Sequence, residues 1–415
     1  MKTIRKTLAI LLSVLLLVAA LVPSVFAAID DSQMSLNRIV SQEEYTLIGG
    51  VIERDLVLKA RTGSHRNEVF VLEVDPFDPD VSIIAGYNDG DADGWGKVPV
   101  RTHAEAAERV LGTNVIGAIN ADFHNQETGE PSGILVMNGV VGHAQNGRPF
   151  FAILNDGTPV IRRGGEAIDD VKEAVSGGNI LIENGKIVAP KNKLNPRTAI
   201  GIKEDKTVVM FVVDGRQDPN SCGMDYPEVA EMMFALGCVD AIELDGGGSS
   251  TLLAQHEGSN SLACRNNPSY GYERKVSTSL LVCTSLQPTG EFDHVQFSSL
   301  NYQVAPVSTI NISVKGIDAN GYATDLPAGG KLVVQETTLG TFNGTTFTAG
   351  SEEGFVTVDY VVDGEVIAST TIEVTQDANN LLESFFQSII DFFNKIINTF
   401  KLLIDKFDEK ILSKL

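Results

Sequence analysis

The sequence predicts an α+β fold. A large, hairpin-rich domain with a mixed sheet is followed by a small immunoglobulin-like β-sandwich and a C-terminal amphipathic helix. Three observations support this prediction: Asn-Gly and Asp-Gly turns recur between β-rich runs, helical patterns are few, and the composition changes twice along the chain. We expect a signal peptide at 1–28, the large domain at 29–285, the sandwich at 291–375 and the helical tail at 379–415.

The N-terminal segment has the pattern of a secretory signal peptide. Lys2, Arg5 and Lys6 form a charged start, residues 8–22 are apolar, and Ala27 ends a small-residue cleavage pattern. The alternative is an anchor that stays in the membrane, but the apolar run is shorter than the roughly 20 residues that span a bilayer. We therefore expect export, and a mature protein that is secreted or held at the cell surface.

The charge of the chain argues against a nucleic-acid partner. Of its 415 residues, 43% are apolar and 21% are charged, which is typical of globular domains. The formal net charge is −22, and a surface of this sign repels a phosphate backbone. We therefore expect no nucleic acid as a partner.

Four cysteines, Cys222, Cys238, Cys264 and Cys283, all lie in the large domain. Their spacing fits no zinc motif. Because an exported chain with an even number of cysteines commonly forms disulfides, we expect at least one bridge, whose partners the sequence does not assign. Four buried thiols are the alternative.

Strands in the large domain are expected where β-branched and apolar residues cluster: 69–74, 115–119, 134–137, 198–202, 208–213 and 241–244. Hairpin turns are expected at 138–139, 155–157 and 184–185, where a turn sequence stands between two β-rich runs. Two helices are expected, at 99–111 and 227–236, each followed directly by a glycine.

The composition changes at Gln287-Pro288-Thr289-Gly290. Residues 291–375 are rich in Thr, Val and Gly. Alternating runs are separated there by turn signals such as Asp363-Gly364, and they lie at 309–314, 331–335, 356–361 and 369–374. Short strands repeated in this way predict an immunoglobulin-like β-sandwich, in which no catalytic pattern is found.

The tail at 379–415 repeats apolar residues at three- and four-residue steps, among them Phe385, Phe386, Ile389 and Phe393. This spacing predicts an amphipathic helix with a broad apolar face. Three roles stay open for it: contact with a membrane surface, packing on its own domain, and self-association.

Polar residues gather where strands of the large domain end. Three clusters stand out: 120–124 (Asn-Ala-Asp-Phe-His), 195–199 with the downstream segment 214–216, and 243–251. Loops at strand ends are exposed and yet firmly placed, so these clusters contain the candidate functional residues.

The third cluster is the most informative. Side chains alternate along a strand, so Glu243 and Asp245 place two carboxylates on one face. Three glycines and three hydroxyl residues follow: Gly246, Gly247, Gly248, Ser249, Ser250 and Thr251. The glycines allow backbone N–H groups to approach an anion, although the lysine and the spacing of a nucleotide P-loop are missing. A tight glycine turn capped by the aspartate is the structural alternative.

Two arginines suit a phosphate group. Arg197 and Arg216 each stand beside a strand end, with Asp214 close by, and a guanidinium group matches phosphate oxygens two at a time. The alternative for each arginine is a surface ion pair. His124 is either an acid–base residue or ligand, or a structural histidine.

Four motifs occur in the order found in a known family: Asn120-Ala121-Asp122-Phe123, Asn195-Pro196-Arg197-Thr198-Ala199-Ile200-Gly201, Val213-Asp214-Gly215-Arg216 and Leu244-Asp245-Gly246-Gly247-Gly248-Ser249-Ser250-Thr251. Over about residues 65–285 the chain resembles the phosphodiester glycosidase family. Ala121 and His124 depart from the first motif usual in that family, Asn-Gly-x-Phe-Phe.

The resemblance implies a hydrolase that cleaves a sugar-1-phosphodiester, of the N-acetylglucosamine-1-phosphodiester type, to free sugar and a phosphomonoester. It implies that Asp245, or else Asp122, is the catalytic carboxylate, with Glu243 orienting them, while a 2-acetamido group of the substrate acting as nucleophile stays open. The residues expected to contact substrate or phosphate are Asn120, His124, Arg197, Thr198, Asp214, Arg216, Gly246, Gly247, Gly248, Ser249 and Ser250.

Two other functions stay open. No cofactor is firmly implied, but Asp122, Asp214, Asp245 and His124 are side chains that a divalent metal accepts, so a metal-dependent phosphodiesterase is one alternative. The other is a non-catalytic glycan-binding or scaffold protein at the cell surface. The expected partner is a sugar-phosphate glycan, such as a cell-wall or capsular polymer, or a small glycoconjugate.

Overall fold

The computed structural model of the protein describes residues 29–87, 95–144, 146–298, 302–335 and 337–376. The predicted signal peptide at 1–28 and the predicted helical tail at 379–415 lie outside the described residues. The chain divides into two compact units. Within the described residues, the first unit consists of 29–47, 51–254 and 262–285, and the second of 48–50, 255–261 and 286–376.

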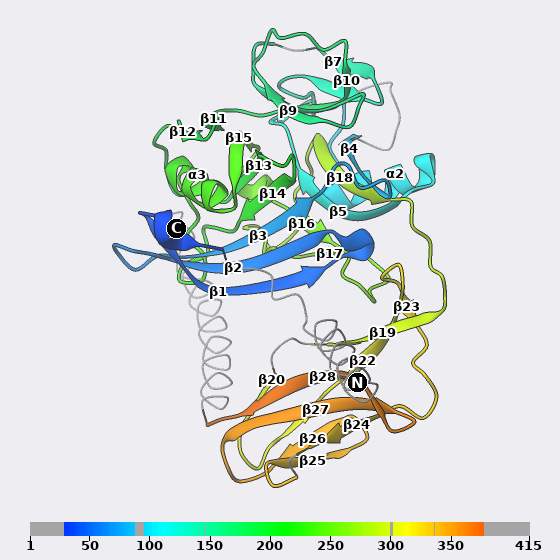
Figure 1. Cartoon of the computed structure of the whole chain (residues 1–415). Coiled ribbons are helices and arrows are strands. Elements are labelled where there is room, and N and C mark those ends of the chain that lie inside the picture. The colour runs from blue at the N-terminus through cyan, green and yellow to red at the C-terminus, as the bar shows by residue number, and fades with distance from the viewer. Residues whose placement is uncertain (1–28, 88–94, 145, 299–301, 336, 377–415) are drawn as a thin grey trace, which may run out of the picture. The chain divides into compact units, whose positions relative to one another are not determined.

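An eight-stranded sheet forms the centre of the first unit, with the strand order β1-β2-β3-β14-β13-β15-β11-β12 (Figure 1). Its strands are β1 (Asn37–Thr46), β2 (Ile52–Ala60), β3 (Arg66–Val74), β14 (Val208–Val213), β13 (Arg197–Lys203), β15 (Cys238–Leu244), β11 (Ile180–Glu183) and β12 (Lys186–Ile187). The central strands β13 and β14 are buried along nearly their whole length, because both faces of the sheet are covered there.

Two five-stranded sheets complete the first unit. One has the order β17 (Ala263–Cys264), β16 (Leu252–Ala254), β5 (Asn114–Asn120), β18 (Thr278–Thr284), β4 (Val81–Tyr87). The other has the order β7 (Val140–His143), β6 (Leu135–Met137), β10 (Val171–Ser176), β8 (Phe150–Leu154), β9 (Pro159–Arg162).

The strands expected in the large domain are confirmed, and so are the hairpin turns. Asn138-Gly139 joins β6 to β7 with φ angles of 46° and 76°, and Asn184-Gly185 joins β11 to β12 with 49° and 72°. The prediction of a mixed sheet is wrong, since every strand pair that the structure describes in the first unit is antiparallel. A parallel pair needs a long crossover, whereas many of these strands are joined by short turns.

Two α-helices occur in the described residues, α2 (Val100–Leu111) and α3 (Tyr226–Ala235), and both were expected. Gly112 ends α2 in the left-handed conformation, with φ 66°. Asp225 begins α3 by accepting a hydrogen bond from the Glu228 amide, while the Glu228 side chain accepts one from the Asp225 amide. Neither helix is long and apolar enough to cross a bilayer.

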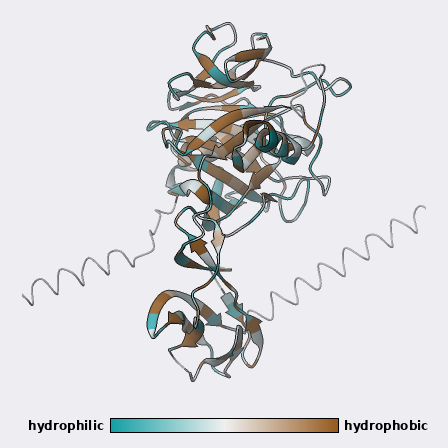
Figure 2. Ribbon diagram, turned by 90° about the vertical axis from the view of Figure 1, so that its right-hand side faces the viewer, coloured by the Kyte–Doolittle hydropathy of each residue, from teal (hydrophilic) through white to brown (hydrophobic). Residues whose placement is uncertain are grey.

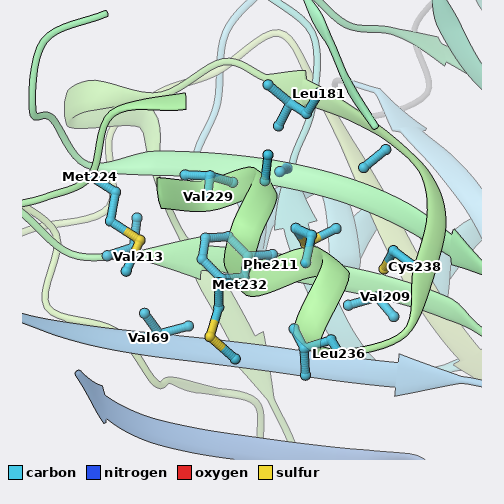
Figure 3. Close-up of a cluster of buried hydrophobic side chains, with 14 of the residues drawn as sticks. Val69, Leu181, Val209, Phe211, Val213, Met224, Val229, Met232, Leu236 and Cys238 are labelled. Carbon is cyan, nitrogen blue, oxygen red and sulfur yellow. The ribbon is translucent and has the colours of Figure 1, made fainter. Parts of the chain in front are cut away.

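The main core of the first unit lies between α3 and one face of the eight-stranded sheet. Figure 3 shows Phe211 and Val213 of β14 facing Val229 and Met232 of α3, and all four side chains are buried. Figure 2 shows the apolar residues of this unit concentrated on its strands. Because this face is closely packed, the strand ends that carry the candidate residues are held firmly.

The expected disulfide is a second incorrect prediction, since all four cysteines are free thiols. Cys238 and Cys283 are buried in β15 and β18, two strands of different sheets. The Cys222 thiol donates instead to the Asp218 carboxylate (3.1 Å) and the Cys264 thiol to the Asn266 carbonyl (3.4 Å). The alternative of four buried thiols holds for Cys238 and Cys283 alone, since Cys222 and Cys264 are half-buried.

The described residues of the second unit form β-strands around one core that includes Phe347, Val356 and Ile372. Its sheets have the orders β19 (Phe292–Phe297), β22 (Val314–Asp318), β23 (Ala323–Thr324); β20 (Tyr302–Val304), β28 (Glu365–Val374), β27 (Gly354–Val362), β24 (Lys331–Val334); and β21 (Thr309–Asn311), β26 (Thr346–Ala349), β25 (Gly340–Asn343). The run expected at 309–314 is divided between β21 and β22, in different sheets. An immunoglobulin-like arrangement stays a prediction.

Candidate active site

Three of the predicted site residues lie on one side of the eight-stranded sheet, where its central strands begin or end. This side is called the site edge below. Strand β13 runs antiparallel to both of its neighbours, so its first residues lie opposite the last residues of β14 and β15. Arg197 pairs with Val213, and Thr198 pairs with Leu244. Asp214 and Asp245, which directly follow those two strands, are therefore brought to the site edge together with Arg197.

A second sheet reaches the site edge through the end of β5. The Asp245 amide donates to the Ala121 carbonyl (2.8 Å), and Asn120 Nδ2 donates to the Asp245 carbonyl (2.6 Å). Asn120 Oδ1 accepts from the Thr198 hydroxyl (2.9 Å) and from the Thr251 amide (3.0 Å). Asn120 is fully buried, and its side chain connects three of the predicted motifs. Its contact with a substrate stays a prediction.

At each of positions 246–248 the surroundings or the backbone explain why the residue is a glycine. A Cβ on Gly246 would lie 2.9 Å from the Pro196 carbonyl oxygen, and one on Gly248 would lie 2.1 Å from the Tyr270 ring. Gly247 has a φ of 63°, and a Cβ there would lie 3.1 Å from Nη2 of Arg216. The Gly247 amide donates to Pro196 (2.8 Å), so of the predicted anion-binding amides this one is already used.

Two carboxyl groups, of Asp122 and Asp245, lie in these motifs: Asp122 is buried, and Asp245 is half-buried. Asp122 Oδ2 accepts from the Gly133 amide (2.8 Å), while its Oδ1 is buried without a hydrogen-bond partner among the described residues. Burial raises the pKa of Asp122 to about 7, and the negative charge of Asp245 adds to this. Burial likewise raises the pKa of Asp245 to about 6, against a hydrogen bond with Ser249. Asp122 therefore holds a proton near neutral pH more readily than Asp245 does.

A chain of hydrogen bonds leads from a cation to His124, whose ring lies beside Asp245. Arg274 Nη2 donates to Oε1 of Gln126, and the Gln126 amide donates to Nε2 of His124 (3.2 Å). With Nε2 accepting, the proton of a neutral imidazole lies on Nδ1, which is 3.8 Å from Oδ2 of Asp245. Burial and the charges of Lys97 and Arg274 lower the pKa of His124, so the neutral form is favoured.

Three arginines near these motifs, Arg148, Arg216 and Arg274, form no ion pair with a carboxylate in the described residues. Arg274 contacts the Ser249 hydroxyl (3.5 Å), and Arg216 donates twice to Oδ1 of Asn195 (3.2 and 3.0 Å). Arg148 donates to the Gly177 carbonyl (2.9 Å), and its charge opposes the rise in the pKa of both Asp122 and Asp245. Such a set of guanidinium groups suits an anionic ligand.

Arg197 and Glu243 hold neighbouring segments of the site in place. Arg197 donates to the carbonyls of Met224 (3.1 Å) and Lys193 (2.5 Å), and its guanidinium lies 4.3 Å from the Tyr226 ring centre. Glu243 accepts from Asn179 (2.9 Å) and also hydrogen-bonds with the Tyr226 side chain. Both residues are buried and fasten the loop at 193–197 and the start of α3, which is a positioning role. Their contact with a substrate stays a prediction.

Asp214 also has a supporting position. Its oxygens accept from Asn266 Nδ2 (2.8 Å) and from the Asn267 amide (2.7 Å), and Asn266 donates further to the Ser250 carbonyl (3.1 Å). Burial raises the pKa of Asp214 to about 6. In the part of the chain that the structure describes, no three His, Cys, Asp or Glu side chains gather closely enough to hold a metal ion.

The motifs just placed lie in a segment with known relatives. Residues 113–283 match the sequence model of the phosphodiester glycosidase family. The predicted resemblance is therefore confirmed. A Bacillus subtilis protein named SPbeta prophage-derived uncharacterized protein YomE is 28% identical over 183 residues, which are 40% of this chain and 27% of that protein. Mouse N-acetylglucosamine-1-phosphodiester alpha-N-acetylglucosaminidase is 30% identical over 164 residues, which are 33% of this chain and 31% of that enzyme.

The chain thus spans less than a third of the length of these two relatives. Among solved structures, the zebrafish N-acetylglucosamine-1-phosphodiester alpha-N-acetylglucosaminidase catalytic domain is similar with a TM-score of 0.44 and 22% identity, covering 63% of this chain and 87% of that one. A hypothetical protein from Synechocystis has a TM-score of 0.46 and 15% identity, covering 56% and 62%.

Within the matched residues 113–283, sequence reasoning missed Gln126, Arg148 and Arg274. None of them belongs to a motif that carries the resemblance, and their approach to Asp122 and Asp245 depends on how three sheets meet. One signal was present for Arg148, which directly follows the turn sequence Asn146-Gly147.

Proposed function

We propose that this protein hydrolyses a sugar-1-phosphodiester and releases the free sugar and a phosphomonoester. The bond that breaks joins C1 of the sugar to the phosphate oxygen. Water supplies the new hydroxyl at C1, and its second proton goes to the phosphate that leaves. N-acetylglucosamine 1-phosphodiesters are the substrate type, since the mammalian relatives carry that substrate in their names.

The observation that carries the proposal is the combination of arginines that pair with no carboxylate and two carboxyls whose pKa burial raises. Arg148, Arg216 and Arg274 supply positive charge where a phosphodiester needs it, in a chain whose net charge is −22. Each well-placed donor to the departing phosphate contributes roughly 3 kcal/mol of transition-state stabilisation. A leaving group that is stabilised in this way needs less help from a general acid than an ordinary alcohol does.

Asp245 and Asp122 have different roles in the reaction. Asp245 has the lower pKa of the pair, about 6, and acts as the ionised carboxylate that faces the anomeric carbon. Asp122, whose pKa is about 7, holds and transfers the proton. His124, with its Nδ1 towards Asp245 and its other nitrogen fixed by Gln126, is a positioning residue for the carboxylate.

We extend the proposal to the setting of the enzyme. The sequence of 1–28 predicts export, and an exported enzyme of this type meets cell-wall or capsular glycopolymers with sugar-phosphate links. In this setting, an immunoglobulin-like unit after residue 285 serves as a spacer or a binding appendage.

The test is a panel of α-linked sugar 1-phosphodiesters, with free sugar and phosphomonoester measured separately. We expect wild-type protein to release both in equal amounts. Asp245→Asn should lower kcat/KM about 10³-fold while circular dichroism and the melting temperature show an intact fold. Asp169→Asn, which removes an exposed carboxylate in the same unit, is the control for a change of charge.

The same panel separates the alternatives. Glycan binding without any turnover, unchanged in Asp245→Asn, would replace the enzyme with a binding protein. Release of sugar phosphate in place of free sugar would mean that the bond on the phosphorus side breaks, and the proposed mechanism would be wrong.

A further inference from the structure

Two tyrosines stand exposed beside the glycine segment of the candidate site. Tyr270 and Tyr272 are 54% and 65% exposed, although large aromatic side chains are usually covered in a folded domain. Their rings are stacked, with centroids 6.2 Å apart and an angle of 26° between the planes. The two rings therefore form one continuous aromatic surface.

This surface is joined directly to the candidate site. The Tyr270 ring occupies the place that a side chain on Gly248 would fill, because a Cβ there would lie 2.1 Å from Cε2. Gly248 is followed by Ser249, which hydrogen-bonds with Asp245. The Tyr270 ring therefore packs directly on the glycine segment that follows Asp245.

Tyr272 leads on to a cavity of about 430 Å³ in the same unit. This volume falls in the range of about 300–1,000 Å³ that small-ligand sites occupy. Besides Tyr272, its lining includes Arg101, Thr102, Asn266 and Glu273. The Arg101 guanidinium is held by Glu273 (2.8 Å) and by the Leu262 carbonyl (2.6 Å), so the polar wall is built and fixed.

We infer that Tyr270, Tyr272 and this cavity form a subsite for a further pyranose ring, so that the substrate is an oligomeric or polymeric glycan rather than a small phosphodiester. The C–H face of a pyranose ring packs on an aromatic ring, while its hydroxyls need polar partners at the edge, and the cavity wall supplies them. This inference rests on the proposed function, since it names the substrate class of that same site.

The experiment compares two synthetic probes: the methyl ester of N-acetylglucosamine 1-phosphate, and a dimer of N-acetylglucosamine 1-phosphate units joined by a phosphodiester. We expect Tyr272→Ala to lower kcat/KM for the dimer at least about tenfold more than for the methyl ester, chiefly through KM. Tyr272→Phe, which keeps the ring, should restore most of the difference. Phe77→Ala is the matched control, because Phe77 is 52% exposed in the same unit and lies outside the site.

A binding measurement keeps the two proposals apart. Asp245→Asn protein, with and without the added Tyr272→Ala change, is titrated with the dimer, and the added change should weaken binding about tenfold. Equal effects of Tyr272→Ala on both probes, or none on either, would overturn the subsite. Failure of wild-type protein to hydrolyse either probe would instead count against the proposed function, and the titration would still decide whether the tyrosines bind the dimer.

Discussion

At the scale of single residues, the reactivity of the site depends on Asp122 and Asp245 holding different protonation states. Turnover requires Asp245 ionised, which happens above its pKa of about 6, and Asp122 protonated, which happens below about 7. We therefore predict a bell-shaped profile of kcat/KM with its maximum between these values, measured by initial rates on one phosphodiester from pH 4 to 9. In Asp122→Asn, the remaining kcat/KM should no longer fall at alkaline pH. A wild-type rate that still climbs above pH 8 would contradict this assignment.

The same carboxyl makes a prediction about stability. The pKa of Asp122 is about 7 when folded and 3.8 ordinarily, so the folded state binds the proton more tightly. Its stabilising effect is present below pH 3.8 and is lost as the pH rises through 7, at up to about 1.4 kcal/mol per pH unit. Asp122→Asn keeps an acceptor for the Gly133 amide and should gain stability relative to wild type from pH 4 to pH 8, as measured by urea unfolding. Glu105→Gln, which changes an exposed carboxyl on α2, is the control, and a pH-independent difference for Asp122→Asn would argue against the shifted pKa.

The sequence could predict the site residues that stand in contiguous motifs, and it placed Asp122, Asp245 and the glycines correctly at one location. It could not separate residues that face a ligand from those that brace the loops. Arg197 belongs to a motif and yet its N–H groups are used by backbone carbonyls, while Arg274 stands outside every motif and approaches Ser249. The difference arises from tertiary hydrogen bonds, which leave no local pattern.

At the scale of elements, α3 begins with a capping box that supports the site. Asp225→Ala removes the acceptor for the Glu228 amide and should lower the free energy of unfolding by about 1 kcal/mol. Because Tyr226 follows directly and contacts Arg197 and Glu243, we also expect a lower kcat. Asp225→Asn keeps the acceptor and serves as the control in both measurements. Equal losses in the two variants would mean that the cap does not carry this effect.

The predicted elements agree with the structure where a local signal is strong. Asn184-Gly185 adopts the positive φ angles that its hairpin requires, and Gly112 ends α2 as expected. Strand β10 was missed, because Lys172 and Glu173 interrupt its apolar pattern, although Glu173 is buried against the amides of Ala85 and Asn138. Which strands pair across the sheets was likewise beyond the sequence, since β3 joins β14 over more than a hundred residues.

At the scale of the whole molecule, three sheets bring distant motifs to one site without a metal-ligand cluster in the described part of the chain. The carboxylate oxygens of Asp214 already accept hydrogen bonds from Asn266 and Asn267. We therefore predict that turnover survives exhaustive dialysis against a chelator. Loss of activity that Mg²⁺ or Zn²⁺ restores would favour the metal-dependent phosphodiesterase instead.

The most direct test of the account is the fate of the oxygen of water. Hydrolysis of an N-acetylglucosamine 1-phosphodiester in ¹⁸O-labelled water should place the label in the hydroxyl at C1 of the released sugar, as read by mass spectrometry of both products at early times. Label in the phosphate group, with none at C1, would contradict cleavage at the anomeric carbon and the roles given to Asp122 and Asp245.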